Sequence, residues 1–533
     1  MTAHALMILG TASHVGKSII TAGLGRIFSD DSIRVAPFKA QNMSLNSAAT
    51  PDGGEIGRAQ ALQAEACRIA SCVEMNPVLI KPRSDSTSQV VLLGKVLGQV
   101  SARDYHTRRV EQLFPVVLES YRKLASQYEL VLLEGAGSPA EVNLREHDIV
   151  NLRMAQASNA ACLLVGDIDR GGVFASLLGT MELLEPNERE LIKGFVINKF
   201  RGDKTLLQPG VEMIERRLGL PCVGVVPYLH DLNLDEEDSV AMKERPTPLK
   251  AWKMDEEGPP NRKLRVGVIA FPHLSNFTDF DALAAEPSVA LAYLHEPDDI
   301  AMADVLILPG TKQTLDDFAW LVSQRFVPQI LQHHEQKRLI VGICGGFQML
   351  GLSMNDAAGM ENDGAPAERE GLKIIGTRTI FLREKTTQLV AGRLCSEILV
   401  GQSLTVTDFK GYEIHLGETR REAGVPAFAT IVRVAEETPG GTEHYDGAVN
   451  ENGRAFGTYV HGIFDEDRFR HSFIAAARAS ASLAPAKEHA WVTSEREDRL
   501  DRLANHLRES LDIKQIRGWI GLMERRDLPL PHF

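Results

Sequence analysis

The sequence predicts an α/β protein with two doubly wound domains, each built around a mostly parallel sheet. Short apolar runs alternate with helical patterns along the chain, glycine-rich turns follow several of these runs, and one charged, proline-containing stretch interrupts the alternation near the middle. Parallel strands need a crossover connection, usually a helix, so this alternation is typical of repeated βα units. The expected strands include residues 5–9, 130–133, 161–165, 194–197, 265–270, 305–308 and 339–343.

The stretch EEDSVAMKERPTPLKAWKMDEEGPPNRK divides the chain into two halves, because charge and proline replace apolar periodicity within it. We expect a first domain over residues 1–235, a linker over 236–263, a second domain over 264–480 and a helical tail over 481–533. The leucines of the tail recur at helical spacing and predict an amphipathic helix. They are Leu500, Leu503, Leu507 and Leu511.

Composition and charge exclude several classes of protein. The 533 residues carry a formal net charge of −13, which argues against nucleic acid as the main partner. An anionic small substrate would need a local basic pocket, for which Lys39, Lys81 and Arg83 are candidates. The six cysteines show neither zinc-site spacing nor the density of a secreted scaffold. With no basic leader and no apolar run of about 18 residues, we expect a cytoplasmic protein that does not bind membranes.

A phosphate-binding loop follows the first expected strand. The residues GTASHVGKS, Gly10 to Ser18, run directly into a helical pattern. Glycines let successive backbone N–H groups face phosphates, a lysine adds a point charge, and a hydroxyl at the helix N-terminus can ligate Mg²⁺. The expected contacts to ATP and its phosphates are Gly10, Thr11, Ser13, Gly16, Lys17 and Ser18, with Ser18 also a magnesium ligand. A glycine-rich turn that binds no nucleotide is the alternative.

This loop resembles that of the dethiobiotin synthetase family, which makes acyl phosphates from carboxylates. It is one residue longer between its glycines than GxxxxGK[ST] and is closer to GTxTxxGK[ST]. The resemblance implies a magnesium ligand at Glu134, which ends an expected strand in the tetrapeptide EGAG. It also implies a phosphate contact for Lys39 and an adenine contact for Asn198, with a surface lysine and a turn asparagine as the alternatives. One acidic residue of that family is absent, because Gln60 stands near its place; the candidate replacements are Asp52 and Glu55.

A cysteine lies between an expected strand and an expected helix in LIVGICGGFQMLG, residues 339–351. The strand ends at Cys344, and the glycines on either side allow a sharp turn that lifts its side chain out of the sheet. The thiolate is the nucleophilic form of cysteine, and the N-terminus of the next helix would stabilise it and offer N–H groups to an oxyanion. A buried structural cysteine is the alternative, since free cysteine is among the most buried residue types.

A thiol nucleophile needs a base, and His461 in GTYVHGIFD follows an expected strand end. Any one of the sixteen histidines could instead be a surface or core residue. An elbow cysteine followed much later by a histidine resembles the class I glutamine amidotransferase domains. That resemblance implies a glutaminase in which Cys344 attacks the amide and His461 protonates the leaving ammonia. The residues it implies for the oxyanion hole and glutamine pocket are Gly310, Gly345 and Gln348.

The acid that orients the histidine is missing from its usual place. Many class I domains have a glutamate two positions after the histidine, but this chain reads His461-Gly462-Ile463. Cysteine needs less help than serine, because its thiol is intrinsically more acidic. We therefore expect a working Cys344/His461 dyad with slow turnover. Asp465 is a candidate third member, although a helix N-cap or an exposed turn residue is the favoured reading of that aspartate.

The two predicted sites together imply an ATP-dependent amidation. Ammonia can displace phosphate from an acyl phosphate, whereas it does not displace hydroxide from a carboxylate. Ordered motifs over nearly the whole chain resemble the cobyric acid synthase family. They include GTASHVGKS, PFKAQNMSLNS, EIGRAQALQAEA, EGAGSPAEVNL, GDIDRGGVFAS, FPHLSNFTDFDAL, LPGTKQT, GICGGFQMLG and GTYVHGIFD.

This resemblance implies a P-loop NTPase-like N-terminal domain, a flavodoxin-like glutamine amidotransferase domain and a corrinoid substrate. It implies amidation of the b, d, e and g carboxylates of adenosylcobyrinic acid a,c-diamide, with glutamine and ATP as co-substrates, Mg²⁺ as cofactor and no tightly bound prosthetic group. One alternative is a cobyrinic acid a,c-diamide synthase, whose relatives have a shorter loop around SGxGK and lack QNMSLNS. Another is a partition-type ATPase switch with an inactive amidotransferase domain.

Overall fold

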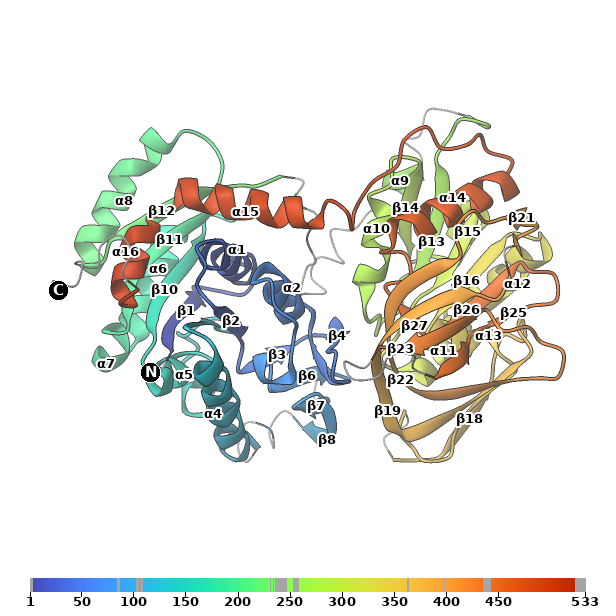
Figure 1. Ribbon diagram of the computed structural model, residues 1–533, viewed down its shortest axis with the longest axis horizontal. Coiled ribbons are helices and arrows are strands. Elements are labelled where there is room, and N and C mark those ends of the chain that lie inside the picture. Colours follow the sequence, from blue (N-terminus) through green and yellow to red (C-terminus); the bar gives the residue numbers. More distant parts are fainter. Residues whose placement is uncertain are drawn as a thin grey trace, which may run out of the picture. The chain divides into compact units, whose positions relative to one another are not determined.

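The computed structural model divides the chain into two units, each with its own sheets and core (Figure 1). The structure describes residues 3–83, 87–101, 105, 109–230, 232, 234, 247–252, 258–361, 364–396, 398–434 and 442–522. Unit 1 comprises Met1–Met43, Ile56–Glu237 and Arg496–Phe533, and unit 2 comprises Ser44–Glu55 and Asp238–Glu495. This division differs from the predicted one, because a short N-terminal segment groups with unit 2 and only the part of the tail from Arg496 onward groups with unit 1. Much of the predicted linker, 236–263, lies outside the described residues.

Unit 1 is built on a six-stranded sheet in which neighbouring strands run parallel, as predicted. Its strands in spatial order are β12 (Cys222–Pro227), β11 (Ile192–Phe200), β10 (Ala161–Asp167), β1 (His4–Gly10), β9 (Leu130–Glu134) and β2 (Val35–Phe38). After β1 the chain adds β2 and β9 on one side of that strand and then β10, β11 and β12 on the other. The direction in which strands are added therefore reverses at β1. Doubly wound folds bind ligands at such a point, outside the carboxyl ends of the strands.

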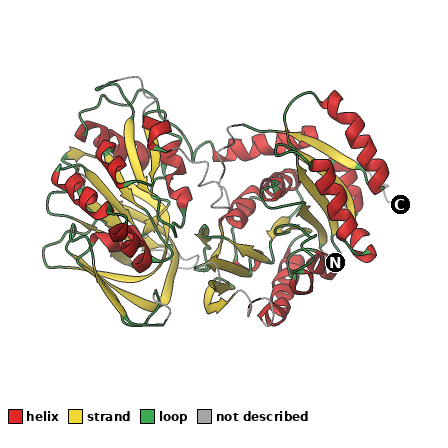
Figure 2. Ribbon diagram, turned by 180° about the vertical axis from the view of Figure 1, so that it is seen from behind, coloured by secondary structure: helices red, strands yellow, loops and turns green. Residues whose placement is uncertain are grey.

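Helices cover both faces of this sheet, as Figure 2 shows. Alternate strand residues face opposite ways, so Met7 and Leu9 pack in one core while Leu6 and Ile8 pack in the other. The first core is covered by α4 (Val110–Gln127), α5 (Leu152–Ser158), α6 (Val173–Leu183) and α8 (Lys204–Leu218), with the one-turn α7 (Pro186–Arg189) between the last two. The second is covered by α1 (Lys17–Asp30), α2 (Arg58–Ala66), α15 (Arg496–Ser510) and α16 (Ile513–Trp519).

The tail forms the predicted amphipathic helix and completes the second core of unit 1. Helix α15 lies beside α1 (Figure 1), and its leucines at 500, 503 and 507 are buried. Gly23 on α1 allows this approach, because a Cβ atom there would lie 2.4 Å from Cδ1 of Leu507. The helical spacing of the leucines therefore predicted correctly that α15 packs against the protein. Its partner, α1, lies far from it in the sequence.

A small mixed sheet lies beside the main sheet of unit 1 and was not predicted. Its strands are β3 (Gln41–Met43), β6 (Val78–Pro82), β7 (Thr87–Leu92) and β8 (Lys95–Ser101), of which only the first pair is parallel. The two-stranded pair β4 (Ser47–Ala49) and β5 (Glu55–Gly57) follows β3 in the chain. These short strands carry too little periodicity to be distinguished from loops.

Unit 2 contains the second predicted parallel sheet. Its strands in spatial order are β14 (Val289–Leu294), β13 (Leu264–Ile269), β15 (Val305–Leu308), β16 (Leu339–Ile343), β26 (Ala455–Thr458) and β25 (Ala448–Val449), the last of them antiparallel. The helices of this unit are α9 (Pro248–Trp252), α10 (Asp281–Ala284), α11 (Thr314–Ser323), α12 (Phe326–Glu335), α13 (Gly345–Leu350) and α14 (Asp467–Ser480). No helix among the described residues is both long and apolar enough to cross a membrane.

Unit 2 also contains a second, largely antiparallel sheet, which was not predicted. It is dominated by two long strands, β19 (Thr377–Leu394) and β22 (Asp408–Arg421), which pair along most of their length. Its other strands are β17 (Ser353–Asp356), β18 (Ala367–Glu370), β23 (Ala429–Arg433), β24 (Glu443–Asp446) and β27 (Val460–His461), and a separate short pair is β20 (Ile398–Leu399) with β21 (Gln402–Ser403). Strand β19 begins with strict alternation of buried and exposed residues, the pattern of a half-buried antiparallel strand.

Candidate active site

The predicted phosphate loop joins β1 to α1 at the carboxyl end of the central strand of unit 1. Gly16, directly before Lys17 opens the helix, has a left-handed φ of 99°, and a Cβ atom there would lie 2.2 Å from the amide nitrogen of Asn198. That amide donates a hydrogen bond to the Val15 carbonyl at 2.8 Å. Asn198 therefore holds the loop backbone in place, and its contact with adenine stays a prediction.

Lys17 connects the loop to the turn after β9. Its ammonium donates to the carbonyl oxygens of Ala12 at 2.9 Å and of Gly137 at 3.0 Å, and the side chain is buried. Of the other loop residues, Gly10 ends β1, Thr11 donates its N–H to the Val165 carbonyl, and Ser13 is exposed. The loop thus presents a buried cation beside backbone that is fixed at both ends.

Glu134 is the centre of a buried polar cluster at the end of β9. Its Oε1 accepts hydrogen bonds from Ser18 Oγ at 2.8 Å and from Lys39 Nζ at 2.9 Å. Its Oε2 accepts one from Gln63 Nε2 at 2.5 Å. The structure thus brings three of the predicted residues together, and it adds Gln63, which sequence reasoning missed.

The predicted substitutes for the missing family aspartate do not belong to this cluster. Glu55 lies within unit 2, where it forms an ion pair with Lys385, and Asp52 accepts a hydrogen bond from Thr50. The side chain of Gln60 binds the Asn42 amide, so it is Gln63, one helical turn later, that reaches Glu134. An (i, i+3) neighbour on the same helix face was the signal available in the sequence.

The cysteine lies on the predicted elbow between β16 and α13. Cys344 has the unusual backbone angles φ 49° and ψ −107°, and its N–H donates to the Thr458 carbonyl at 2.8 Å. Gly346 must be glycine, because a Cβ atom there would lie 1.9 Å from the Leu308 carbonyl oxygen. Strain of this kind at a strand-to-helix turn is characteristic of nucleophile elbows.

His461 is held between the cysteine and an aspartate. Its Nδ1 lies 2.6 Å from Oδ2 of Asp279, whose Oδ1 accepts the N–H of Gly462 at 3.0 Å. The Cys344 side chain also interacts with this imidazole. Burial disfavours the imidazolium, but the carboxylate of Asp279 and the interaction with Cys344 outweigh it and raise the pKa of His461 to about 10. The imidazole therefore carries its proton at neutral pH.

Asp279 supplies the third member that the sequence analysis expected to be missing. It occupies Nδ1 of His461, the ring nitrogen that an orienting acid binds, so Asp465 does not fill that role. Asp279 comes from the short helix Phe277–Phe280 before α10, far from His461 in the chain. An acid bound to Nδ1 fixes the tautomer and orientation of a catalytic histidine, so the arrangement is a triad rather than the predicted dyad.

The three residues predicted for the oxyanion hole and glutamine pocket surround this triad. A Cβ atom at Gly310, after β15, would lie 2.8 Å from Cε1 of His461, and Gly345 is the first residue of α13. The Gln348 side chain accepts a hydrogen bond from Thr314 at 3.1 Å and donates one to Tyr459 at 3.1 Å. Gln348 thus ties α13 to its neighbours, and its contact with glutamine stays a prediction.

Comparison with known proteins identifies the family of each domain. Residues 6–240 match the model of a CobQ/CobB/MinD/ParA nucleotide binding domain, and residues 265–469 match that of a CobB/CobQ-like glutamine amidotransferase domain. A cobyric acid synthase from Sorangium cellulosum is 45% identical to this chain, over 98% of this chain and 100% of the relative. The chain belongs to the cobyric acid synthase family. Cobyric acid synthases of Klebsiella pneumoniae (44% identical, 99% of each chain) and Pelotomaculum thermopropionicum (43% identical, 99% of this chain and 98% of the relative) are also similar.

Membership of the cobyric acid synthase family makes this chain an ATP-dependent ligase with a glutamine amidotransferase domain. The residues that sequence reasoning missed lie inside stretches already matched to that family, Gln63 in EIGRAQALQAEA and Asp279 in FPHLSNFTDFDAL. The motifs therefore include Gln63 and Asp279, but they do not indicate that these side chains bind Glu134 and His461. Partner identity depends on which loops the fold brings together.

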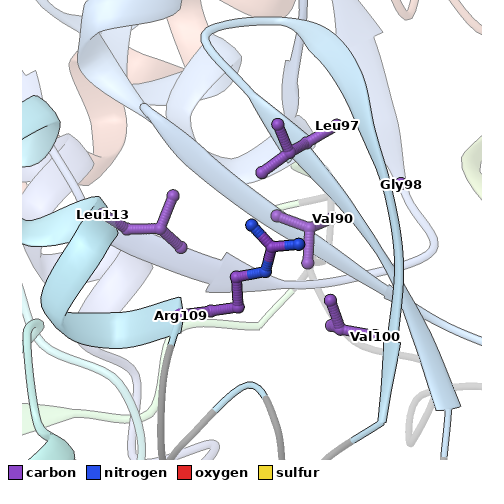
Figure 3. Close-up of a pocket in the computed structure, with 6 residues that line it drawn as sticks. All are labelled: Val90, Leu97, Gly98, Val100, Arg109 and Leu113. Carbon is purple, nitrogen blue, oxygen red and sulfur yellow. The ribbon is translucent and has the colours of Figure 1, made fainter.

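A small pocket in unit 1 is separate from the predicted site residues. Figure 3 shows the Arg109 side chain extending between Leu113 of α4 and residues of β7 and β8. The pocket is lined by Val90, Leu97, Gly98, Val100, Arg109 and Leu113. None of the residues predicted to bind ATP, glutamine or metal is among them, so this pocket is no guide to the substrate.

The triad leads to a first prediction, that Asp279→Asn lowers the glutaminase rate on the order of 10²-fold. An asparagine amide can donate to Nδ1, which favours the neutral tautomer with its proton on Nε2 and removes the carboxylate that stabilises the imidazolium. Loss of the carboxylate also lowers the pKa of His461, so the basic limb of the pH profile of kcat/KM should move to lower pH. Glutamate release measured between neutral and alkaline pH checks both effects.

Asp465→Asn is the matched control for this prediction. We expect it to change the glutaminase rate less than about tenfold and to leave the pH profile in place. Ammonia-dependent amidation, measured in both variants, reports that the protein is folded. Equal losses in the two variants, or an unshifted profile for Asp279→Asn, would contradict the assignment of Asp279.

Proposed function

We propose that this chain converts adenosylcobyrinic acid a,c-diamide to adenosylcobyric acid, by amidating the b, d, e and g carboxylates with ATP and glutamine. The observation that carries the proposal is the presence of two sites in one chain: the Cys344–His461–Asp279 triad in unit 2 and the loop with Lys17 and Glu134 in unit 1. The first is suited to releasing ammonia, and the second is suited to activating a carboxylate. The name of the relatives supports the corrinoid as the acceptor.

The glutaminase step follows from the triad. Cys344 Sγ attacks the side-chain carbonyl carbon of glutamine, and backbone N–H groups at the start of α13 would stabilise the oxyanion. His461 gives its proton to the amide nitrogen, the C–N bond breaks, and ammonia leaves a thioester on the cysteine. Water then adds to the thioester and gives a proton to His461, the C–S bond breaks, and glutamate and the Cys344 thiolate are released. Asp279 keeps the Nδ1 proton in place throughout, which leaves Nε2 as the nitrogen that gives and takes the proton.

The synthetase step begins when a carboxylate oxygen of the substrate attacks the γ-phosphorus of ATP. ADP leaves with the electrons of the broken P–O bond, and the product is an acyl phosphate. Ammonia then adds to the acyl carbon, and phosphate is expelled. Lys17 is the buried cation placed to stabilise charge on the transferring phosphoryl group, and Lys39 stands beside Glu134 at the same site.

The donor set of this site fits Mg²⁺. Ser18 Oγ and the Glu134 carboxylate are hard oxygen ligands, and their oxygens lie 2.8 Å apart next to the first turn of α1. These two residues would hold the ion. When bound, Mg²⁺ neutralises phosphate charge during transfer. Gln63 and Lys39 meanwhile fix the Glu134 carboxylate from either side.

Mass spectrometry of the corrinoid after incubation with ATP, Mg²⁺ and glutamine tests the proposal. Four successive amidation products from the a,c-diamide, with ATP and glutamine consumed in equal amounts, are expected. Two amidations of cobyrinic acid, with none of its a,c-diamide, would instead indicate a cobyrinic acid a,c-diamide synthase. ATP hydrolysis without any glutaminase activity would indicate a nucleotide-driven switch.

A further inference from the structure

A twelve-residue segment, Ser44–Glu55, belongs structurally to unit 2 although its neighbours in the sequence on both sides belong to unit 1. The segment contains the strand β4 and is mostly buried. Most of its polar residues are as enclosed as its apolar ones, with Thr50 at 0% and Ser47 at 1% exposure, and the charged residue at its turn, Asp52, is exposed. A surface excursion would leave such groups in water, so this segment is an integral part of unit 2.

Hydrogen bonds and one buried ion pair fix the segment. The Glu55 carboxylate accepts a hydrogen bond from Ser47 Oγ at 2.8 Å and forms an ion pair with Lys385 Nζ at 2.6 Å. The Glu55 side chain is fully buried and that of Lys385 nearly so. Removing one partner of a buried pair leaves an uncompensated charge, so this contact specifies one arrangement of the segment.

The segment lies against residues that contact the nucleophile and the base of the triad. Ala49 packs in one cluster with Tyr412 and Ile414 of β22. The Tyr412 ring stacks on the His461 ring, with centroids 5.4 Å apart and planes at 21°. The Ile414 carbonyl accepts the thiol of Cys344 at 3.8 Å. Displacement of Ala49 would therefore shift residues that contact both Cys344 and His461.

The segment is connected to Asp279, the third member of the triad, through a backbone hydrogen bond to Asn276. Ser47 donates its N–H to Oδ1 of Asn276 at 3.1 Å. Asn276, in a left-handed conformation, begins the one-turn helix that carries Asp279. Asp279 in turn binds His461. The segment thus contacts a neighbour of each triad residue while contributing no reacting group itself.

Both ends of the segment continue into the phosphate site of unit 1. Lys39 precedes it by a few residues and binds Glu134. After it, the chain enters α2, where Gln63 binds the other oxygen of the same carboxylate. A ligand at Glu134 that displaced Lys39 or Gln63 would act on residues that the chain joins directly to the two ends of the segment.

We infer that Ser44–Glu55 is a positioning element that couples glutamine hydrolysis to occupancy of the ATP site, with the Glu55–Lys385 ion pair as its anchor. This inference rests on the proposed function. Such coupling means that ligands bound at the phosphate site change the rate of glutamine hydrolysis at the triad. Tyr412, Ile414 and Asn276 are the contacts through which the segment acts.

The test compares the unmodified full-length chain with Lys385→Met and Glu55→Gln. Glutamate release is measured with and without ATP plus the corrinoid a,c-diamide, together with the ratio of glutamate released to amide formed. We expect ATP plus acceptor to stimulate the unmodified chain at least about tenfold, in the usual range of allosteric coupling, and both variants less than about threefold. The ratio of glutamate to amide should rise severalfold in the variants, while ammonia-dependent amidation stays within about twofold of the unmodified rate.

Lys373→Met is the matched control, because it breaks an exposed ion pair with Glu370 in the same unit and should leave stimulation unchanged. Lys385→Arg, which keeps the charge, should restore part of the stimulation and so separates loss of coupling from loss of fold. Full stimulation in Lys385→Met, or none in the unmodified chain, would overturn the inference. Failure of the unmodified chain to form amide from either nitrogen source would instead reject the proposed function.

Discussion

Cys344→Ala should abolish glutamine-dependent amidation and leave ammonia-dependent amidation near the unmodified rate. Loss of the nucleophile removes the thioester route entirely, and removal of such a residue costs on the order of 10⁴-fold or more in comparable enzymes. The phosphate site lies in unit 1 and shares no residue with the triad, so added ammonia can still meet the acyl phosphate. Amide formation with glutamine or with ammonium salt at alkaline pH, measured on one preparation, checks both halves of the expectation.

Cys395→Ala is the control for this variant, because Cys395 is an exposed cysteine of the same unit. It should behave like the unmodified chain with either nitrogen source. If the folded Cys344→Ala protein made no amide even at high ammonia, the two sites would not divide the reaction as proposed. Residual glutaminase in that variant would remove Cys344 from its role as nucleophile.

Lys17→Ala should lose amidation with both nitrogen sources, by about 10²-fold or more. The Lys17 ammonium is the buried cation of the phosphate loop, and its bonds to Ala12 and Gly137 also set the loop conformation. Both nitrogen sources depend on the same phosphoryl transfer, so neither can bypass this loss. ADP formation and amide formation are measured together with glutamine and with ammonia.

Lys204→Ala provides the comparison, since Lys204 is an exposed lysine at the start of α8 in the same unit. That variant should keep the unmodified rates. Glutamate release without ATP should survive in Lys17→Ala, which shows that the triad is intact. ATP-dependent amidation at an undiminished rate in Lys17→Ala would reject the phosphate-loop assignment.

The parts of the structure that sequence predicted are those governed by local pattern. The loop before Lys17 and the elbow at Cys344 each join a strand to a helix through a short glycine turn. The residues of each short stretch therefore determine its geometry without help from distant segments. The amphipathic tail is likewise a local signal, because its leucines recur on one face. These elements were placed correctly without knowledge of their partners.

The parts that sequence missed depend on contacts between distant segments. The bond between Asp279 and His461 joins residues 182 positions apart, and nothing near either one identifies the other. The dyad prediction failed because it sought the acid close to His461. The excursion of Ser44–Glu55 into unit 2 was missed for a related reason, since an ion pair with Lys385 that fixes it spans 330 positions.

The docking of α15 on α1 has a consequence for the order in which the protein folds during synthesis. The strands and helices of unit 1 up to residue 237 emerge from the ribosome before the main part of unit 2, Asp238–Glu495, but the leucines that cover α1 follow after residue 496. Until then the apolar surface around Gly23 has no cover from Leu503 and Leu507. The ATP-binding unit is therefore finished only after the amidotransferase unit has been made. If the gene were split at the linker, the first polypeptide would expose the apolar surface of α1. A separate peptide that contains α15 would be needed to cover that surface.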